Sequence, residues 1–381
     1  MKSSFLPIAE PDLSQIEEEM ILQAVRSGWV SSLGEFIGRF EKNFANFCQM
    51  PFASTVCNGT AALHLALVAR GVGPGDEVII PSLTFVATAA AVMHAGATPV
   101  FVDCIADVGV IDPKAVEAAL TNRTKAIIAV HLYGHPADMD PLLEIAEAHN
   151  LLLLEDAAEA HGASYKGRRV GSLGHMATFS FYGNKIMTTG EGGMILSSAE
   201  EDDARVRFLR DHAMDPKKRY WHPEVGFNYR MTNIQAALGV AQLSRFAEVS
   251  RKRADILLAY RQLGLNETFG LAINPKLSWA EPAPWLVCAL LPNALPLGTR
   301  DQICSSLRTH DIDTRPYFYP IHLMPPYQGC RCVGADGTSE LVNTLSLSAR
   351  GFNLPSSPHM TLQDIFRVGE ALKIELAKVI S

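Results

Sequence analysis

The sequence has little charge and no excess of positive charge. Charged residues make up 19% of its 381 residues, whereas hydrophobic residues make up 48%. The net charge of −7 at pH 7 argues against non-specific binding to nucleic acid. An anionic ligand must therefore meet local cations rather than a general positive field. This composition is typical of a globular chain with a large core, and the length favours two domains.

Cysteine pairs are also scarce. The seven cysteines are an odd number with scattered spacing, and only Cys330 and Cys332 lie close together. No second Cys/His pair accompanies them, which argues against a zinc site, so we expect reduced thiols and no metal. The first twenty residues lack an apolar stretch of signal-peptide length. We therefore expect a cytoplasmic protein.

One segment without formal charge, if His94 is neutral, runs through residues 79–102. Its length would allow a membrane span. However, Pro81, Gly96 and Pro99 interrupt it. A strand, a helix and a second strand explain the segment better, so no membrane association is expected.

Strand-like and helix-like segments alternate through the first half of the sequence. The expected strands are residues 53–56, 78–80, 99–103, 125–131 and 151–155. Helices are expected from near Gly59 and at residues 84–94, 112–120 and 139–149. The last strand is a continuous apolar run, which is typical of a strand buried on both faces. The alternation predicts an α/β fold in which helices cover a mostly parallel sheet.

The pattern changes in the second half of the sequence. A long helix is predicted from Thr232 to about Leu263, where a glycine ends it. We therefore divide the chain into a large domain, residues 1–263, which includes this connecting helix, and a smaller C-terminal α+β domain, residues 264–381.

Lys185 lies in a loop between two expected strands, and its neighbours are almost uncharged. We expect its amine to point into a crevice at the strand ends, where open α/β sheets bind ligands. A desolvated lysine has a lowered pKa and can form a Schiff base with a carbonyl. Asp156, at the end of a buried strand, needs a cationic or hydrogen-bonding partner. Enzymes that use pyridoxal phosphate (PLP) pair such a lysine with an acid at the pyridinium nitrogen.

Four motifs occur in the order NGTAALHLAL, EDAAEAHGA, SFYGNKIMTTGEGGM and GFNYRMTNIQAALG. Together they resemble the DegT-type sugar-nucleotide aminotransferases, which are fold-type I PLP enzymes. The likeness extends from about Pro7 to His322. It implies a PLP cofactor that cycles through pyridoxamine phosphate (PMP), and a large PLP-binding domain with a smaller C-terminal domain.

The resemblance assigns four residues to the reacting end of the cofactor. Lys185 would carry PLP and move the proton, and Asp156 would hold the pyridine nitrogen. Glu159 would lie near the ring hydroxyl, with no cation expected beside it, and Phe85 would stack on the ring. The alternatives are an exposed loop lysine, a structural acid, a helix-surface glutamate and a core phenylalanine.

The resemblance also places the phosphate and the substrate. Gly59 and Thr60, at the start of a helix, would bind the phosphate together with Ser180. The alternatives are a helix N-cap for Gly59 and Thr60 and a strand-edge serine for Ser180.

Three further residues would act beyond the cofactor. Asn228 would reach the phosphate from the neighbouring subunit of a homodimer with shared active sites, and Arg230 and His322 would contact substrate. A surface salt bridge is the alternative for Arg230, and a structural turn for His322. Residues 215–229 are rich in aromatic residues without a clear period, which favours an interface loop.

The implied reaction transfers an amino group from an amino acid, L-glutamate being expected, to a 4-keto sugar nucleotide. The resemblance most suggests GDP-4-keto-6-deoxymannose, with GDP-perosamine as product. The alternatives are another keto sugar nucleotide, a keto-cyclitol or a non-catalytic PLP-binding regulatory protein. PLP-dependent elimination is disfavoured, because a branch of the family with that chemistry has histidine where Lys185 stands here.

Overall fold

The computed structural model describes residues 5–380, so residues 1–4 and 381 of the two expected domains lie outside it. Its main sheet consists of β1 (Phe52–Val56), β2 (Glu77–Pro81), β3 (Thr98–Val102), β4 (Thr124–Val130), β5 (Leu152–Asp156), β8 (Met176–Ser180), β9 (Gly193–Ser197) and β14 (Cys332–Val333). The strand order is β1-β9-β8-β5-β4-β2-β3-β14. Only β9 runs antiparallel to its neighbours. The expected mostly parallel sheet is therefore confirmed.

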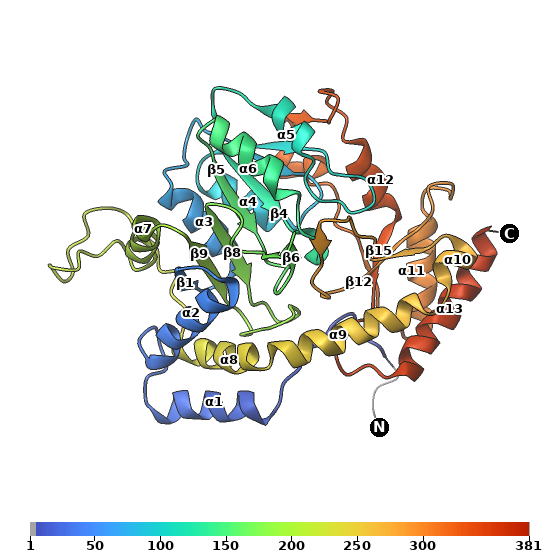
Figure 1. Cartoon of the computed structure of the whole chain (residues 1–381), viewed down its shortest axis with the longest axis horizontal. Coiled ribbons are helices and arrows are strands. Elements are labelled where there is room, and N and C mark those ends of the chain that lie inside the picture. The colour runs from blue at the N-terminus through green and yellow to red at the C-terminus, as the bar shows by residue number, and fades with distance from the viewer. Residues whose placement is uncertain (1–4, 381) are drawn as a thin grey trace.

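Helices cover both faces of this sheet (Figure 1). One face carries α3 (Gly59–Ala69), α4 (Ala87–His94) and α7 (Glu200–Arg210). The other carries α2 (Glu35–Cys48), α5 (Pro113–Ala119), α6 (Met139–Ala148) and α8 (Asn233–Ser244), and α1 (Gln15–Arg26) packs on α8. The apolar side chains on each face form a separate cluster. Because both faces are covered, the central strands β2, β4 and β5 are apolar over most of their length, and their charged residues lie at or near the strand ends.

The uncharged segment of residues 79–102 forms strand, helix and strand, as predicted, although α4 begins at Ala87 rather than near Thr84. Among residues 5–380, every helix is too short or too polar to cross a membrane.

The strand that precedes the Lys185 loop is fixed by aromatic packing from α2. Phe40 and Phe44 are fully buried, and they contact Phe181 and Phe179 at ring distances of 5.1 and 4.9 Å. Aromatic pairs at such distances add to the free energy of burial. This packing holds β8 and the start of the following loop against the helix layer.

The long helix expected from Thr232 is interrupted at Arg245, which separates α8 from α9 (Phe246–Arg261). Arg245 has φ −103° and ψ 4°, outside the helical range. Its guanidinium binds Glu17, in the first turn of α1, and Asp12, just before that helix. This buried ion-pair cluster lies at the junction of the two helices, and α9 continues toward the C-terminal part of the chain (Figure 1).

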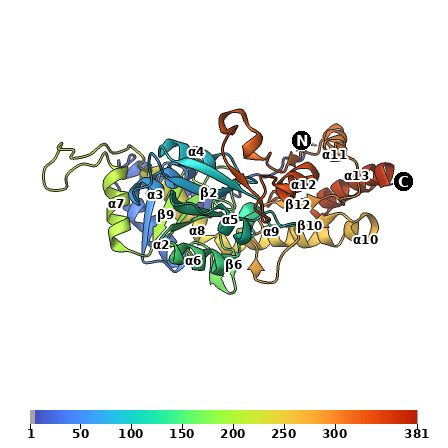
Figure 2. The same ribbon diagram turned by 90° about the horizontal axis from the view of Figure 1, so that it is seen from above.

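The C-terminal part contains an antiparallel sheet of order β10-β12-β15-β13 and lies at one end of the molecule (Figure 2). Its strands are β10 (Ala272–Ile273), β12 (Val287–Leu290), β13 (Arg315–Pro316) and β15 (Gly351–Leu354). Its helices are α10 (Leu265–Phe269), α11 (Thr299–Thr309), α12 (Val342–Arg350) and α13 (Leu362–Ile380). Together with α9, these elements build a separate hydrophobic cluster.

Several short elements join the two parts. Strand β14 pairs with β3 of the main sheet, and β11 (Ala280–Glu281) pairs with β6 (Ser164–Tyr165), which also pairs with β7 (Arg168–Arg169). The 3-10 helices are η1 (Leu132–Gly134), η2 (Ile321–Leu323) and η3 (Pro325–Tyr327). These connections bring the C-terminal segment of residues 315–333 back over the carboxyl edge of the main sheet.

Candidate active site

Lys185 lies in the loop between β8 and β9, and its side chain is 11% exposed. Its Nζ lies 3.7 Å from Oε1 of Glu159. Burial lowers the pKa of the Lys185 amine, while the charges of Glu159 and Asp156 oppose that shift. The expectation that no cation lies beside Glu159 is therefore wrong. The loop folds the amine back onto the segment that follows β5, and sequence spacing alone does not reveal this contact.

Asp156 ends strand β5 and is buried. Its carboxylate accepts hydrogen bonds from Thr88 Oγ1 at 2.9 Å and from the Ala158 amide at 3.3 Å. Burial raises the pKa of Asp156, and these donors together with the Lys185 charge oppose the increase. Both hydrogen-bond donors are neutral, and among residues 5–380 no cationic side chain forms an ion pair with this carboxylate, although a buried charge needs a close partner. A protonated ring nitrogen would supply that cation.

Glu159 is held by the backbone of Tyr133, whose amide donates to Oε2 at 2.7 Å. Burial raises the pKa of Glu159 to about 7. Tyr133 has φ 50°, a left-handed conformation that costs energy for a residue with a side chain and is enriched at functional sites. The Tyr133 hydroxyl in turn accepts a hydrogen bond from the Phe318 amide at 3.0 Å. Tyr133 therefore links Glu159 to the C-terminal segment.

The sequence reasoning missed Tyr133, although a signal was available. Tyr133 follows β4 by a few residues, at the carboxyl edge where open α/β sheets bind ligands. Glu155, in contrast, points away from Lys185, as strand alternation predicts. Its carboxylate binds His131 Nε2 at 3.0 Å and the amides of Gly171 and Leu173.

Gly59, Thr60 and Ser180 lie together where α3 begins. A Cβ atom on Gly59 would lie 2.8 Å from Cβ of Ser180, so only glycine permits this approach. The Asn58 side chain caps the helix by accepting the Ala61 amide at 2.8 Å. The amides of Gly59 and Thr60 have no partner within the helix. A helix N-terminus with free amides and a hydroxyl group fits a phosphate.

Phe85 and His322 lie at the same edge of the sheet. Phe85 is 55% exposed, and its ring centroid lies 5.8 Å from that of Phe318. His322 Nδ1 lies 2.7 Å from the hydroxyl oxygen of Ser82, the residue that follows β2. Within residues 5–380, neither side chain shows a contact with Lys185. Ser82 was not identified from the sequence, and it fixes the orientation of the His322 ring.

Asn228 and Arg230 are not brought to Lys185 within residues 5–380. Asn228 is exposed and forms a backbone bridge with Asp211. Arg230 forms an ion pair with the Asp211 carboxylate, which corresponds to the alternative left open for it. The loop that leads to Asn228 projects from the body beyond α7 in both ribbon views (Figures 1 and 2).

Within residues 5–380, two polar side chains near the Lys185 loop have buried atoms for which no hydrogen-bond partner is seen. One is the Oδ1 atom of Asn184, next to Lys185 in the chain, and the other is the His161 imidazole. The His161 ring packs against Phe44, Phe179 and Phe181, and burial lowers its pKa to about 3. His161 is therefore neutral at physiological pH.

The residues present fit PLP. Gly59 and Ser180 would hold the phosphate, the Asp156 carboxylate would pair with the ring nitrogen, and the buried Lys185 amine of lowered pKa would bind the aldehyde. The unpartnered Asn184 oxygen also leaves polar capacity beside that amine.

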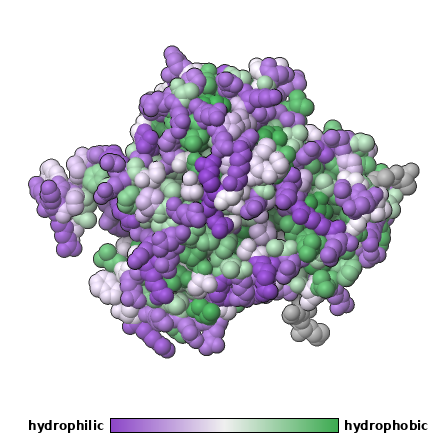
Figure 3. All heavy atoms as spheres, in the orientation of Figure 1, coloured by the Kyte–Doolittle hydropathy of each residue, from purple (hydrophilic) through white to green (hydrophobic). Residues whose placement is uncertain are grey.

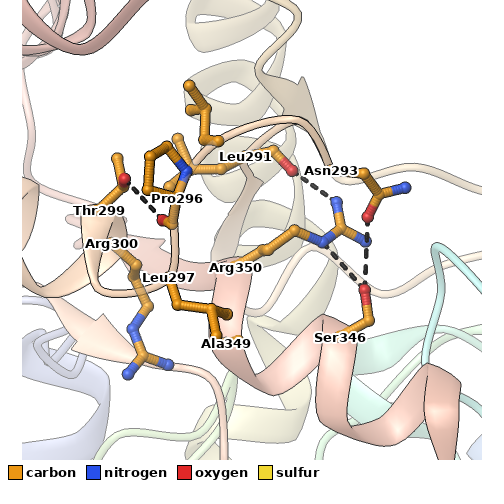
Figure 4. Close-up of a pocket in the computed structure, with 10 residues that line it drawn as sticks. Leu291, Asn293, Pro296, Leu297, Thr299, Arg300, Ser346, Ala349 and Arg350 are labelled. Carbon is orange, nitrogen blue, oxygen red and sulfur yellow. Dashed lines mark hydrogen bonds between the residues drawn. The ribbon is translucent and has the colours of Figure 1, made fainter.

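A separate pocket of about 210 Å³ lies in the C-terminal part, lined by residues that include Arg300 and Arg350 (Figure 4). Arg350 donates to the Leu291 carbonyl at 2.5 Å and to the Ser346 hydroxyl at 3.1 Å. Arg300 binds Asp301 and the Ser348 carbonyl. Both guanidinium groups are thus engaged by the chain itself, so this pocket does not compete with Lys185 as the reactive site.

The chain matches known proteins along almost its whole length. Residues 11–373 match the family described as DegT/DnrJ/EryC1/StrS aminotransferases. A GDP-perosamine synthase of Caulobacter vibrioides is 47% identical over 368 residues, covering 96% of this chain and 97% of the relative. A GDP-perosamine synthase of Escherichia coli O157:H7 is 38% identical over 368 residues, covering 97% of this chain and 98% of the relative.

The overall fold also matches that of solved aminotransferase structures. The PMP form of a putative sugar aminotransferase from Streptococcus pneumoniae superposes with a TM-score of 0.91 at 28% identity, covering 99% of this chain and 98% of that one. The family match, the relatives and the fold agree with the geometry around Lys185. The chain belongs to the DegT/DnrJ/EryC1/StrS aminotransferase family and is a PLP-dependent aminotransferase.

Proposed function

We propose that this enzyme transfers an amino group from L-glutamate to GDP-4-keto-6-deoxymannose and so forms GDP-perosamine. The observation that carries the proposal is the 47% identity, over nearly the full length, to a relative named for that product. The site supports it, because a buried lysine of lowered pKa lies 3.7 Å from Glu159 and within the electrostatic influence of Asp156 at the edge of the sheet.

The proposed roles follow from the chemistry of each side chain. PLP, when bound, supplies an electron sink that stabilises negative charge at the donor's α-carbon. The Lys185 amine, whose pKa is lowered by burial, would take the proton from that carbon and deliver it to the cofactor carbon that bears the amino nitrogen, so that the amino group stays with the cofactor. The same amine would move the proton in the opposite direction when the keto sugar receives the amino group. Asp156 keeps the ring nitrogen protonated, and Glu159 orients the Lys185 amine. The phosphate is held by Gly59, Thr60 and Ser180.

The substrate is tested with purified enzyme, L-glutamate and a panel of keto substrates. The panel contains 4-keto-6-deoxy sugars linked to GDP, dTDP and UDP, together with a keto-cyclitol. We expect the highest kcat/KM for the GDP sugar, because a site built to hydrogen-bond one base rejects others by a factor of 10 or more, up to about 10⁴. Mass spectrometry of the amino sugar and an assay for 2-oxoglutarate measure the two products.

Each other result favours a specific alternative. A preference for another base or for the cyclitol would replace the proposed substrate but leave the chemistry intact. Absence of 2-oxoglutarate with every substrate, from protein that binds PLP, would instead favour a non-catalytic regulatory role.

We further propose a homodimer in which each subunit completes the active site of the other. The support is the loop of residues 215–229, which stands clear of the body in Figure 3 and contains Tyr220 and Trp221 at 75% and 53% exposure. Aromatic residues and arginine are enriched in protein interfaces. A two-fold arrangement would let each subunit present Asn228 and Arg230 to its neighbour.

Subunit complementation tests the shared site. Inactive Lys185→Ala is mixed with inactive Asn228→Ala, and the chains are allowed to exchange. If the sites are shared, a mixed dimer holds one intact site, so random exchange returns up to about a quarter of the wild-type activity. The matched control mixes Lys185→Ala with Asp156→Asn. Both of those residues serve their own subunit, so no recovery is expected. If exchange is confirmed and no activity returns with Asn228→Ala, then Asn228 serves the active site of its own subunit.

We also propose the division into a large domain of residues 1–263 and a small domain of residues 264–381, together with a cytoplasmic location. The separate hydrophobic cluster in the C-terminal part supports the division, although β11 and β14 cross it to pair with strands of the other part. The location rests on cysteine usage, which lacks the pairing pattern of oxidised proteins.

A further inference from the structure

Trp285 makes two contacts with the Lys185 segment. The Lys185 Nζ lies 4.0 Å from the centroid of the indole ring. The indole Nε1 donates a hydrogen bond to the carbonyl oxygen of Asn184 at 2.8 Å. Trp285 is 3% exposed, so water does not weaken either contact. One side chain therefore holds both the lysine amine and the backbone carbonyl that precedes it.

Trp285 is itself held by contacts outside the Lys185 loop. Its carbonyl accepts a hydrogen bond at 2.9 Å from Arg253, a buried residue of α9. Its amide donates to the Ala283 carbonyl at 2.9 Å. The indole ring also stacks near Tyr133, with centroids 6.2 Å apart and an angle of 25°. The ring position is thus set by elements outside the Lys185 loop.

Trp285 and Glu159 hold the amine jointly. Tyr133 joins them, because its ring contacts Trp285 while its backbone amide binds Glu159 at 2.7 Å. Glu159 offers the amine a carboxylate at 3.7 Å, and Trp285 offers the face of a π-system at 4.0 Å. A flexible four-carbon side chain with only one partner would occupy many rotamers. Two partners reduce that freedom.

We propose that Trp285 is a positioning residue for amino transfer, which seats the free amine of Lys185 and fixes the carbonyl before it. The inference rests on the proposed role of Lys185 as the proton-transferring group. When the amine is free, it must return to one place each time it takes or gives a proton. Proton transfer is sensitive to such placement, because a displacement of about 1 Å can cost about 10²-fold in rate.

The pKa of the Lys185 amine depends on the charged and polar groups around it, so it can report whether the indole ring of Trp285 acts on the amine. Glu159 and Asp156 face the amine with negative charge, Arg315 on β13 acts on it with positive charge, and the neutral His161 lies nearby. The face of an indole ring is negative and favours a nearby ammonium group. Removing the ring should therefore lower the pKa of Lys185, whereas a merely structural tryptophan would leave that pKa unchanged.

Two substitutions separate the two contacts. Trp285→Phe keeps an aromatic face and removes the N–H group, and Trp285→Leu removes both. The matched control is Trp279→Phe, because Trp279 is partly buried and its indole N–H lies 3.4 Å from the Pro136 carbonyl, with no contact to Lys185. The full-length chain freed of cofactor is acetylated over a range of pH, and mass spectrometry of the Lys185 peptide gives the lysine pKa.

We expect Trp285→Leu to lower the Lys185 pKa by roughly 0.5 to 1.5 and to lower kcat about 10-fold or more with little change in KM. Trp285→Phe should leave the Lys185 pKa close to its wild-type value but lower kcat several-fold. Trp279→Phe should have the same Lys185 pKa and kcat as wild type. An unchanged pKa and kcat in folded Trp285→Leu would overturn the proposal.

If Trp285→Leu does not fold, an unchanged kcat in Trp285→Phe overturns the proposal instead. A failure of the proposed function can be distinguished from a failure of this inference with wild-type enzyme alone. If PLP is bound at a lysine other than Lys185, the role that Trp285 is proposed to support does not exist.

Discussion

We expect Lys185→Ala to abolish turnover while the chain still folds and still binds the cofactor phosphate. The substitution removes both the covalent attachment point and the base, and loss of proton transfer alone costs about 10²- to 10⁴-fold in kcat. The Lys185 side chain is buried, but its only ion-pair partner seen within residues 5–380 is Glu159, so folding does not depend on a larger charge network. Activity is measured with L-glutamate and the preferred keto sugar nucleotide.

The attachment is tested directly on wild-type enzyme. Borohydride reduction of the PLP-loaded protein should leave a pyridoxyl mass on the peptide that contains Lys185. The matched control is Lys166→Ala, because Lys166 is exposed and its side-chain contacts are an ion pair with Asp140 at 2.7 Å and the ring of Tyr165 at 5.0 Å. This control should retain wild-type activity and spectrum. A pyridoxyl mass on another lysine would contradict the assignment.

We expect Asp156→Asn to lose far more of its activity than of its bound cofactor. The amide keeps the size of the side chain and its contact with Thr88, but it cannot supply the negative charge that keeps a ring nitrogen protonated. We expect kcat to fall by about 10²- to 10³-fold, the scale for loss of a preorganised electrostatic contact. The PLP content, measured by absorbance after dialysis, should stay near that of wild type.

The control for Asp156 is another buried aspartate that is remote from the site. Asp202 lies on α7 and pairs with Arg70 at 3.0 Å, so Asp202→Asn removes a partly buried charge of the same kind. We expect Asp202→Asn to keep its kcat. An Asp156→Asn enzyme as active as wild type would show that Asp156 is a structural acid, which was the alternative at the sequence level.

The sequence by itself determined the architecture of the sheet and the two principal groups of the site. Apolar runs such as that of β5 could be read directly, because a strand covered on both faces has no polar face to show. Asp156 and the Lys185 loop follow strands, and the carboxyl ends of parallel strands meet at one edge. A charged residue after such a strand therefore indicates a site without any knowledge of side-chain contacts.

Only the tertiary structure decided how the amine of Lys185 is surrounded. Trp285 lies 101 residues from Asn184, and Tyr133 reaches the C-terminal segment through the Phe318 amide. Neither contact follows from periodicity, because each depends on how the C-terminal part docks on the main sheet. Likewise, Glu159 meets the amine of Lys185, which comes from the loop between β8 and β9. The long helix is interrupted at Arg245, where the side chain binds Asp12 and Glu17 from the start of the chain. Local patterns encode which face of an element is buried, whereas the partner met there depends on long-range packing.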